Sequence, residues 1–284
     1  MQKLTVLLPL LLLFSIAQAS ILPENNLAIP VSEKNEGLSE SQYNSIIDKV
    51  ENVYRPIVEN EGRKLTIKRL WESSVVNAGT LRNGKEIIVK LYGGYARHSM
   101  VTEDGYALVI CHELGHHLGG VPRKIYDATG EVAWPSVEGQ ADYFATLKCL
   151  RKVFRKDDNV EAAKNLSIPD YIKEKCSAPF EEEWEQALCM RTTMAGIAIS
   201  NISADIRNTE RPDVETPDDS VVEKTYEAHP VPQCRLDTYF QGSICEVSSY
   251  RSLSDRNEIT GTCHAKEGHS EGTRPLCWYK PSDI

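Results

Sequence analysis

The segment His112-Glu113-Leu114-Gly115-His116 carries two imidazoles four residues apart, with a carboxylate directly after the first. Because a step of four residues returns to the same face of an α-helix, His112 and His116 can bind one metal ion while Glu113 points beside it. An H-E-x-x-H segment on a helix is typical of zinc sites in which the glutamate is the general base. The segment therefore predicts a metal site with a proton acceptor at its edge.

A third imidazole, His117, directly follows this motif. At about 100° per residue it lies roughly 140° around the helix from His112, so the two rings cannot easily share one metal ion. We therefore expect His117 to be a polar neighbour on the flank of the helix.

The third protein ligand decides the class of the site. Metzincins supply it as the last histidine of H-E-x-x-H-x-x-G-x-x-H, but here Gly119 fits the glycine and Pro122 stands where that histidine belongs. A glutamate from a following helix is the other common solution, and Glu138 offers it. Asp142, four residues on, would share its helical face and could accept the Nδ1–H of a ligand histidine. Glu131 is the competing candidate and lacks such a partner.

Two histidines and one carboxylate leave the fourth position of a zinc ion open, which is typical of catalytic sites. Zinc lowers the pKa of its bound water toward about 7, and Glu113 could take the proton. The reaction implied is peptide hydrolysis, so the expected cofactor is one Zn²⁺ ion and the expected partner is a protein or peptide substrate.

Helices must position these groups. From about residue 102, apolar residues recur at the three- and four-residue spacing of a helix, and Gly119-Gly120 ends this pattern. Two more long helices are expected over about 136–154 and 181–206. Upstream, a helix capped by Ser39 should kink or end at Pro56. Short strands follow it, two of them joined through the hairpin signal Asn83-Gly84. These elements predict an α+β fold, mainly helical, with a small sheet beside the two metal-bearing helices.

Composition limits the possible partners and the number of domains. The 284 residues are 41% hydrophobic and 26% charged, which fits one sizeable core. Acidic residues outnumber Lys and Arg by 41 to 32, for a net charge of −9, so the chain offers no basic stripe for nucleic acid.

The N-terminal residues indicate the compartment. Lys3, an apolar run and the triplet Ala17-Gln18-Ala19 predict a cleaved signal peptide over residues 1–19. The polar residues 20–37 are expected to be mobile, and nothing later is apolar enough to span a membrane. The mature protein should therefore be exported, either periplasmic or secreted.

All eight cysteines follow this signal, which suggests disulfides. Cys263 and Cys277 are the pair favoured by their local spacing. The alternative for some cysteines, notably Cys111 in an apolar run, is a buried free thiol.

The chain resembles the gluzincin metallopeptidases of the HtpX, BepA and CAAX-prenyl-protease type in three motifs and one upstream segment. The first motif is His112 to His116. The second is Glu138-Gly139-Gln140-Ala141-Asp142 followed by Tyr143-Phe144-Ala145, which is similar to the family's E-x-x-A-D-x-x-A. The third is His229-Pro230-Val231-Pro232-Gln233-Cys234-Arg235, and Asn77-Ala78 resembles the family's N-A edge segment.

This resemblance implies a role for each matching residue. His112, His116 and Glu138 would bind zinc, with Glu113 as general base and Asp142 orienting a ligand. His229 would donate a hydrogen bond to the transition-state oxyanion, and Arg235 would help to hold the site. Asn77 and Ala78 would lie on an exposed strand edge that binds an extended peptide by backbone pairing, the alternative being an ordinary hairpin strand.

The resemblance further implies a zincin-like domain over residues 38–247 and a zinc-dependent endopeptidase, while the cysteine-containing tail 248–284 lies outside it. Many family members carry transmembrane helices or repeats that are missing from this sequence, so their membrane substrates are not carried over. Two alternatives stay open: a metal-containing envelope chaperone or binding factor with little proteolysis, and a zinc exopeptidase.

Overall fold

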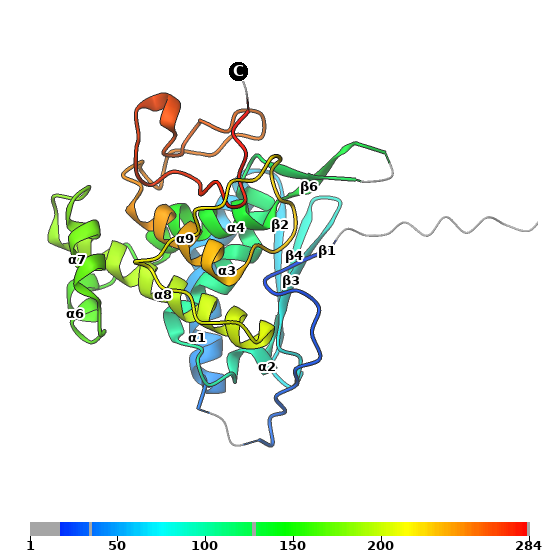
Figure 1. Ribbon diagram of the computed structural model, residues 1–284. Coiled ribbons are helices and arrows are strands. Elements are labelled where there is room, and N and C mark those ends of the chain that lie inside the picture. The colour runs from blue at the N-terminus through cyan, green and yellow to red at the C-terminus, as the bar shows by residue number, and fades with distance from the viewer. Residues whose placement is uncertain (1–17, 34–35, 127–128, 283–284) are drawn as a thin grey trace, which may run out of the picture.

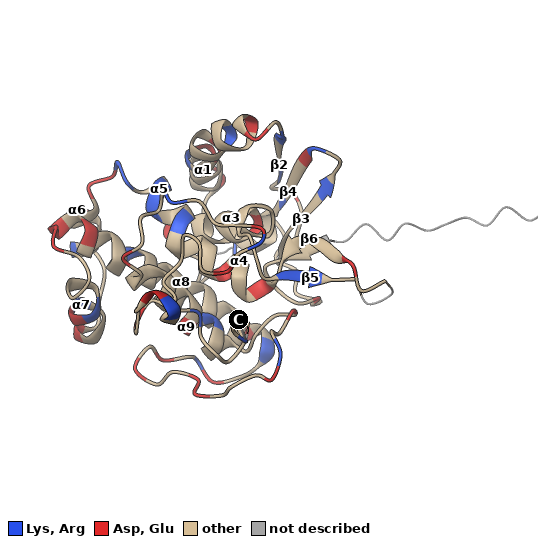
Figure 2. Ribbon diagram, turned by 90° about the horizontal axis from the view of Figure 1, so that it is seen from above, with Lys and Arg blue, Asp and Glu red and all other residues tan. Residues whose placement is uncertain are grey.

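Helix α3 (Glu103–Leu118) lies at the centre of the fold in the computed structural model, which describes residues 18–33, 36–126 and 129–282 (Figure 1). Thr102 caps this helix by accepting a hydrogen bond from the Gly105 N–H, and residues 105–117 are all buried. The helix packs against α1, α4, α8 and strand β3. Seen from above, α1 and α4 lie on either side of α3 (Figure 2).

The main sheet has four strands in the order β1-β3-β4-β2. Strands β3 (Ala78–Asn83) and β4 (Glu86–Tyr92) form an antiparallel hairpin whose turn contains Gly84 at φ 56°. Strand β2 (Lys64–Leu70) pairs parallel with β4, and β1 (Gln18–Ser20) pairs antiparallel with β3. The hairpin expected at Asn83-Gly84 is confirmed.

Helix α1 (Glu40–Asn60) begins with the capping box of Ser39 and Gln42. Of the kink or end expected at Pro56, the end is wrong, because the helix continues for another turn to Asn60. Tyr54 and Val58 are buried on either side of the proline, and their packing holds this last turn although Pro56 has no N–H to donate.

The helix that carries the expected ligand Glu138 is built from α4 (Glu138–Phe144), the π-helical turn η1 (Ala145–Leu150) and α5 (Arg151–Val153). The residues that join these three parts have right-handed helical backbone angles, so the chain runs helically from 138 to 153. It follows a two-stranded sheet of β5 (Arg123–Ile125) and β6 (Val132–Ser136).

The remaining helices are α2 (Gly93–Ala96), α6 (Asn159–Lys164), α7 (Asp170–Ser177), α8 (Glu183–Arg207), α9 (Pro232–Ile244) and the 3-10 turn η2 (Ala265–Glu267). Among them, α8 packs against α3, and α6, α7 and α9 pack against α8. Arg191 of α8 donates to both carboxylate oxygens of Asp104 at 2.6 and 2.8 Å, which ties α8 to the start of α3. The predicted α+β, mainly helical fold with a small sheet is confirmed.

Four disulfides bind these elements together: Cys111–Cys149, Cys176–Cys189, Cys234–Cys277 and Cys245–Cys263. The predicted pair Cys263–Cys277 is therefore wrong, because the fold brings each of these cysteines to a partner on or next to α9. Cys111 is not a free thiol either, since it joins α3 to η1. Four disulfides fit an exported protein, because such bonds persist in oxidising compartments.

The C-terminal residues pack on α4. Trp278 is fully buried against Gly139, where a Cβ would come within 2.2 Å of the ring. Arg274 Nε donates to Gln140 Oε1 at 2.6 Å. The tail from residue 248 thus packs around the helix that begins at Glu138.

The predicted signal peptide lies outside the described residues except for Gln18 and Ala19, which belong to β1. Ile21 and Leu22, at the start of the segment expected to be mobile, are instead completely buried. Within the described ranges, every helix is too short or too polar to cross a membrane.

Candidate metal centre and its surroundings

Helix α3 brings His112, Glu113 and His116 into the interior, and all three side chains are completely buried. The Nε2 atoms of His112 and His116 are 3.1 Å apart, and the two rings stand nearly perpendicular. His117 points elsewhere: its Nε2 lies 2.8 Å from Thr80 Oγ1 and its ring stacks on Trp134. Its position agrees with the angle expected for a helix.

The partners of the two rings fix which nitrogen faces the centre. His112 Nδ1 lies 2.7 Å from Asp142 Oδ1, and His116 Nδ1 lies 2.9 Å from the Ser136 carbonyl oxygen. Both oxygens accept, so both Nδ1 atoms donate. In the neutral rings the two Nε2 atoms therefore carry lone pairs, and these lone pairs face one another.

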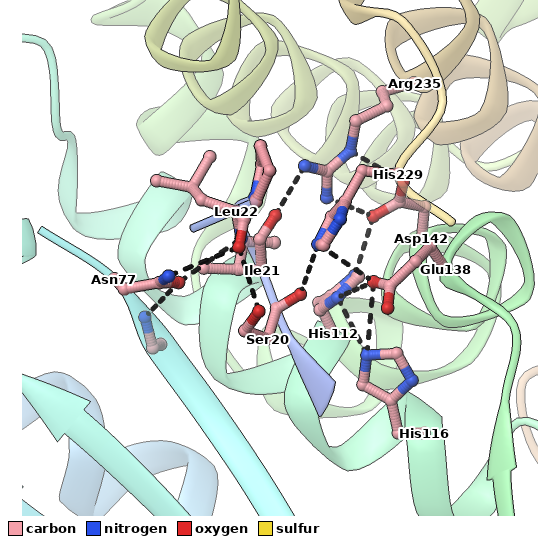
Figure 3. A network of polar contacts seen from close by, with 12 residues as sticks. Ser20, Ile21, Leu22, Asn77, His112, His116, Glu138, Asp142, His229 and Arg235 are labelled. Carbon is pink, nitrogen blue, oxygen red and sulfur yellow. Dashed lines mark hydrogen bonds and ion pairs between the residues drawn. The ribbon is translucent and has the colours of Figure 1, made fainter. Parts of the chain in front are cut away.

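Glu138 completes the group from the first residue of α4. Its Oε2 lies 3.3 Å from His112 Nε2 and 3.4 Å from His116 Nε2 (Figure 3). Its Oε1 accepts a hydrogen bond from Lys124 Nζ at 2.6 Å. Strand β6 ends at Ser136, two residues before Glu138, and the Ser136 carbonyl contacts His116. The end of β6 therefore places Glu138 next to the same ring. The competing Glu131 is exposed and does not belong to this group.

The three facing atoms can hold a metal ion. Tetrahedral zinc with bonds of about 2.0–2.1 Å separates its ligand atoms by roughly 3.3 Å, close to the separations of 3.1, 3.3 and 3.4 Å. Among the described residues, Glu138 Oε2 has no hydrogen-bond donor. Three buried acceptor atoms that face one another in this way form a group that could bind a cation.

Burial and charge shift the pKa values of these groups. Burial opposes ionisation of Glu138, but His116, His229 and Lys124 outweigh it and hold its pKa well below the usual range. Burial likewise lowers the pKa of His112, but the Asp142 carboxylate outweighs it and raises that pKa to about 9. For His116 burial prevails, and its pKa is lowered.

Glu113 stands apart from the ligand atoms. Burial raises its pKa to about 8, His112 opposes the rise, Glu138 adds to it, and the Ile21 backbone N–H opposes it. Neither carboxylate oxygen accepts a hydrogen bond of good geometry in the described part of the chain. A buried carboxylate without a donor is suited to accept a proton.

Asp142 is the centre of a buried network that orients His112. Arg235 donates to its Oδ2 through Nε at 2.8 Å and to its Oδ1 through Nη2 at 2.7 Å. The Tyr239 hydroxyl, one turn further along α9, donates to Oδ1 at 2.6 Å. Burial opposes the ionised form of Asp142, but Arg235 and His112 outweigh it, and its pKa is strongly lowered.

His229 reaches the metal group from the loop before α9. Its Nε2 lies 3.5 Å from Glu138 Oε2 and 2.7 Å from the carbonyl oxygen of Ser20. Because a carbonyl only accepts, Nε2 carries the proton. Burial lowers the pKa of His229 to about 4, so the ring is a neutral donor at pH 7.

Asn77 and Ala78 lie where strand β3 begins. The Asn77 side chain accepts from the Leu22 N–H at 3.3 Å and donates to the Leu22 carbonyl at 3.2 Å (Figure 3). The Ala78 carbonyl accepts from the Ile21 N–H at 3.3 Å. Residues of the chain itself thus pair with the strand edge expected to bind peptides.

Sequence reasoning missed Lys124, Tyr239 and the segment Ser20 to Leu22. The spacing of four residues between Arg235 and Tyr239 was a usable signal, since it places both on one face of α9. Lys124 and the N-terminal segment had none, because both reach the site through long-range folding.

Comparisons with models of known protein families, with curated proteins and with solved structures found no match.

Proposed function

We propose that this chain is an exported zinc-dependent endopeptidase, periplasmic or secreted, that hydrolyses protein or peptide substrates. The observation that carries the proposal is the buried His112–His116–Glu138 group beside Glu113, whose oxygens lack a donor in the described structure. Two imidazoles and one carboxylate are the ligand set of known catalytic zinc sites. The three motifs that resemble gluzincins of the HtpX and BepA type support the same function.

His112, His116 and Glu138 would hold the zinc ion. When bound, zinc acts as a Lewis acid and lowers the pKa of a water molecule toward about 7. Asp142 and the Ser136 carbonyl keep the two rings in the tautomer that presents Nε2. Lys124 holds Glu138 Oε1, which leaves Oε2 to face the rings.

Glu113 would take a proton from the attacking water and pass it to the leaving amine. The neutral His229 would donate its Nε2–H to the carbonyl oxygen, whose negative charge grows during attack. That donor already binds a peptide carbonyl at 2.7 Å, that of Ser20. Arg235 would bind the carbonyl of the following residue, as it does for Ile21 at 2.6 Å.

The test compares the exported wild-type chain with Glu113→Gln and with the control Glu131→Gln. We expect Glu113→Gln to retain zinc and to lose activity on unfolded casein by about 10²- to 10⁴-fold, because only the proton acceptor is removed. Glu131→Gln should match the wild type, since Glu131 is exposed. Zinc is measured by mass spectrometry of the metal, and cleavage by peptide release with and without a chelator.

Full activity of Glu113→Gln, or casein cleavage that a chelator does not affect, would contradict the proposal. Bound zinc without cleavage by the wild type would favour a binding factor or chaperone. Release of single terminal residues only would favour an exopeptidase.

A further inference from the structure

The chain's own N-terminal segment crosses the candidate site in extended form. Strand β1 pairs antiparallel with β3, with Ala19 opposite Thr80 and Ser20 opposite Gly79. The pairing continues past the strand, since the Ile21 N–H donates to the Ala78 carbonyl at 3.3 Å. The segment therefore adds a strand to the edge of the sheet, as peptide ligands do in strand addition.

Three successive carbonyls of this segment are each bound by a side chain of the site. His229 Nε2 contacts the Ser20 oxygen at 2.7 Å, Arg235 Nη1 donates to the Ile21 oxygen at 2.6 Å, and Asn77 Nδ2 donates to the Leu22 oxygen at 3.2 Å (Figure 3). These donors come from the loop before α9, from α9 itself and from the start of β3. Each donor binds backbone, so the contacts do not depend on the side chains of the segment.

The peptide bond between Ser20 and Ile21 lies at the metal group. His229, which binds the Ser20 oxygen at 2.7 Å, is 3.5 Å from Glu138 Oε2. The carbonyl of this bond is thus held by the residue that would stabilise the oxyanion of a scissile bond, next to the group that would hold the metal ion. The residues on the two sides of this peptide bond differ in solvent exposure: Ile21 and Leu22 are completely buried, and Ser20 is half-buried.

We propose that Ser20 to Leu22 form an autoinhibitory segment that occupies the peptide-binding cleft in the register of a substrate. The segment defines the preferred ligand as an extended peptide with an aliphatic residue directly after the bond at the centre, because Ile21 fills a fully enclosed position. This inference rests on the proposed function for the identity of the cleft. Substrates gain access only when the segment leaves the edge of β3.

The surroundings allow the segment to leave. A cavity of ≈ 390 Å³ lies beside it, lined by Ser20, Glu24, Asn25, Val75, Asn77, Ala78 and Tyr92. The described residues from Pro23 to Gly37 form no helix or strand of the main sheet beyond the single bridge of Ala28 to Val75. Cleavage of the predicted signal after Ala19 would remove Gln18 and Ala19 of β1, but it would keep Ser20 opposite Gly79 and all three carbonyl contacts.

The test measures peptide binding to the exported chain in the Glu113→Gln background, so that nothing is cleaved. The probe is a fluorescent peptide with the sequence of residues 18–23. The added variant Ile21→Asp places a charge in the enclosed position and should release the segment. Leu27→Asp is the matched control, since Leu27 belongs to the same stretch but is 43% exposed.

We expect Ile21→Asp to bind the probe at least about tenfold more tightly than the parent, and Leu27→Asp to bind as the parent does. The tethered segment has an effective concentration of about 1 mM, and we take its Kd for the cleft as about 100 μM. Competition by the segment then raises the apparent Kd of the added probe about tenfold, and release of the segment removes this factor. A probe in which aspartate replaces the isoleucine should bind much more weakly. Hydrogen exchange of the backbone amides at positions 21 and 22 should become fast in Ile21→Asp.

A folded Ile21→Asp protein with exposed segment amides that binds the probe no better than the parent would overturn the inference. So would equal binding of the aspartate probe. Casein cleavage by the same chain with Glu113 restored separates the two proposals: cleavage without a gain in probe binding rejects only the autoinhibitory segment. A gain in probe binding without any zinc-dependent cleavage rejects only the endopeptidase.

Discussion

Replacing Asp142 with asparagine tests the network that orients His112. Asp142 is completely buried and accepts hydrogen bonds from His112, Arg235 and Tyr239 at 2.6–2.8 Å. Asparagine preserves the volume but removes the charge and turns an NH₂ group toward a donor. Arg235 then stays buried without a counter-charge, and His112 loses the acceptor that fixes its tautomer.

Two magnitudes follow. Removing one partner of a buried ion pair costs about 3–5 kcal/mol, so the metal-free protein should lose that much free energy of unfolding. Loss of the group that orients a ligand histidine weakens metal binding by about 10- to 100-fold. The two effects are separable, because the first is measured without metal and the second on folded protein.

Urea unfolding of the metal-free chains measures the stability, and competition with a chromogenic chelator measures the zinc affinity. The control is Asp170→Asn in α7, where the side chain is 97% exposed and should matter for neither quantity. A folded Asp142→Asn chain that binds zinc as tightly as the wild type would refute the role of Asp142 in orienting His112. An unchanged free energy of unfolding would refute the argument from the buried pair.

Three further predictions concern the third ligand, a buried lysine and a disulfide. Glu138→Gln should lose both zinc and peptidase activity, whereas Glu131→Gln should keep both; metal analysis of the two purified variants checks this. Burial lowers the pKa of Lys148 to about 7, while an unfolded lysine titrates near about 10.4, so the unfolded chain binds more protons between these pH values. Its free energy of unfolding should therefore rise with pH over that range, and Lys148→Met should reduce the rise in urea titrations at several pH values, the remainder coming from groups such as Lys152, whose pKa burial lowers to about 8. Replacing Cys111 and Cys149 with serine should cost about 4 kcal/mol, from the loop of 38 residues that the bond closes, and should weaken zinc binding because the bond joins the two metal-bearing helices.

One result would contradict each of the predictions for Glu138, Lys148 and the Cys111–Cys149 bond. Zinc retained in Glu138→Gln with normal turnover would move the third ligand elsewhere. A pH dependence unchanged by Lys148→Met would assign the rise to other groups. Undiminished zinc affinity without the Cys111–Cys149 bond would show that packing alone aligns the helices.

The elements around the motif were predictable because their signals are local. Thr102 and Gly119 mark the ends of α3 in the sequence, and a four-residue step then decides that His112 and His116 share a face. Asn83-Gly84 similarly fixes the hairpin of β3 and β4. Glu138 was distinguishable from Glu131 only through Asp142, since a supporting acid on the same face is also a local pattern.

Other features depend on distant contacts and carry no local signal. A proline inside a helix usually ends or kinks it, yet the buried Tyr54 and Val58 pack on either side of Pro56 and stabilise the last turn of α1. The polar composition of residues 20–37 resembles that of a mobile terminus, but backbone pairing with β3 needs no particular side chain. Disulfide partners are equally hidden, because Cys263 finds Cys245 through the path of the whole tail.

The contact between Trp278 and Gly139 bears on how the protein is made. Gly139 directly follows Glu138, and the indole covers it so closely that no larger residue fits without a shift. Glu138 is translated long before Trp278, so the side of α4 at Gly139 stays uncovered until residue 278 has been added. The native packing around Gly139 therefore needs this late residue, and Cys277 beside it is bonded to Cys234 of α9.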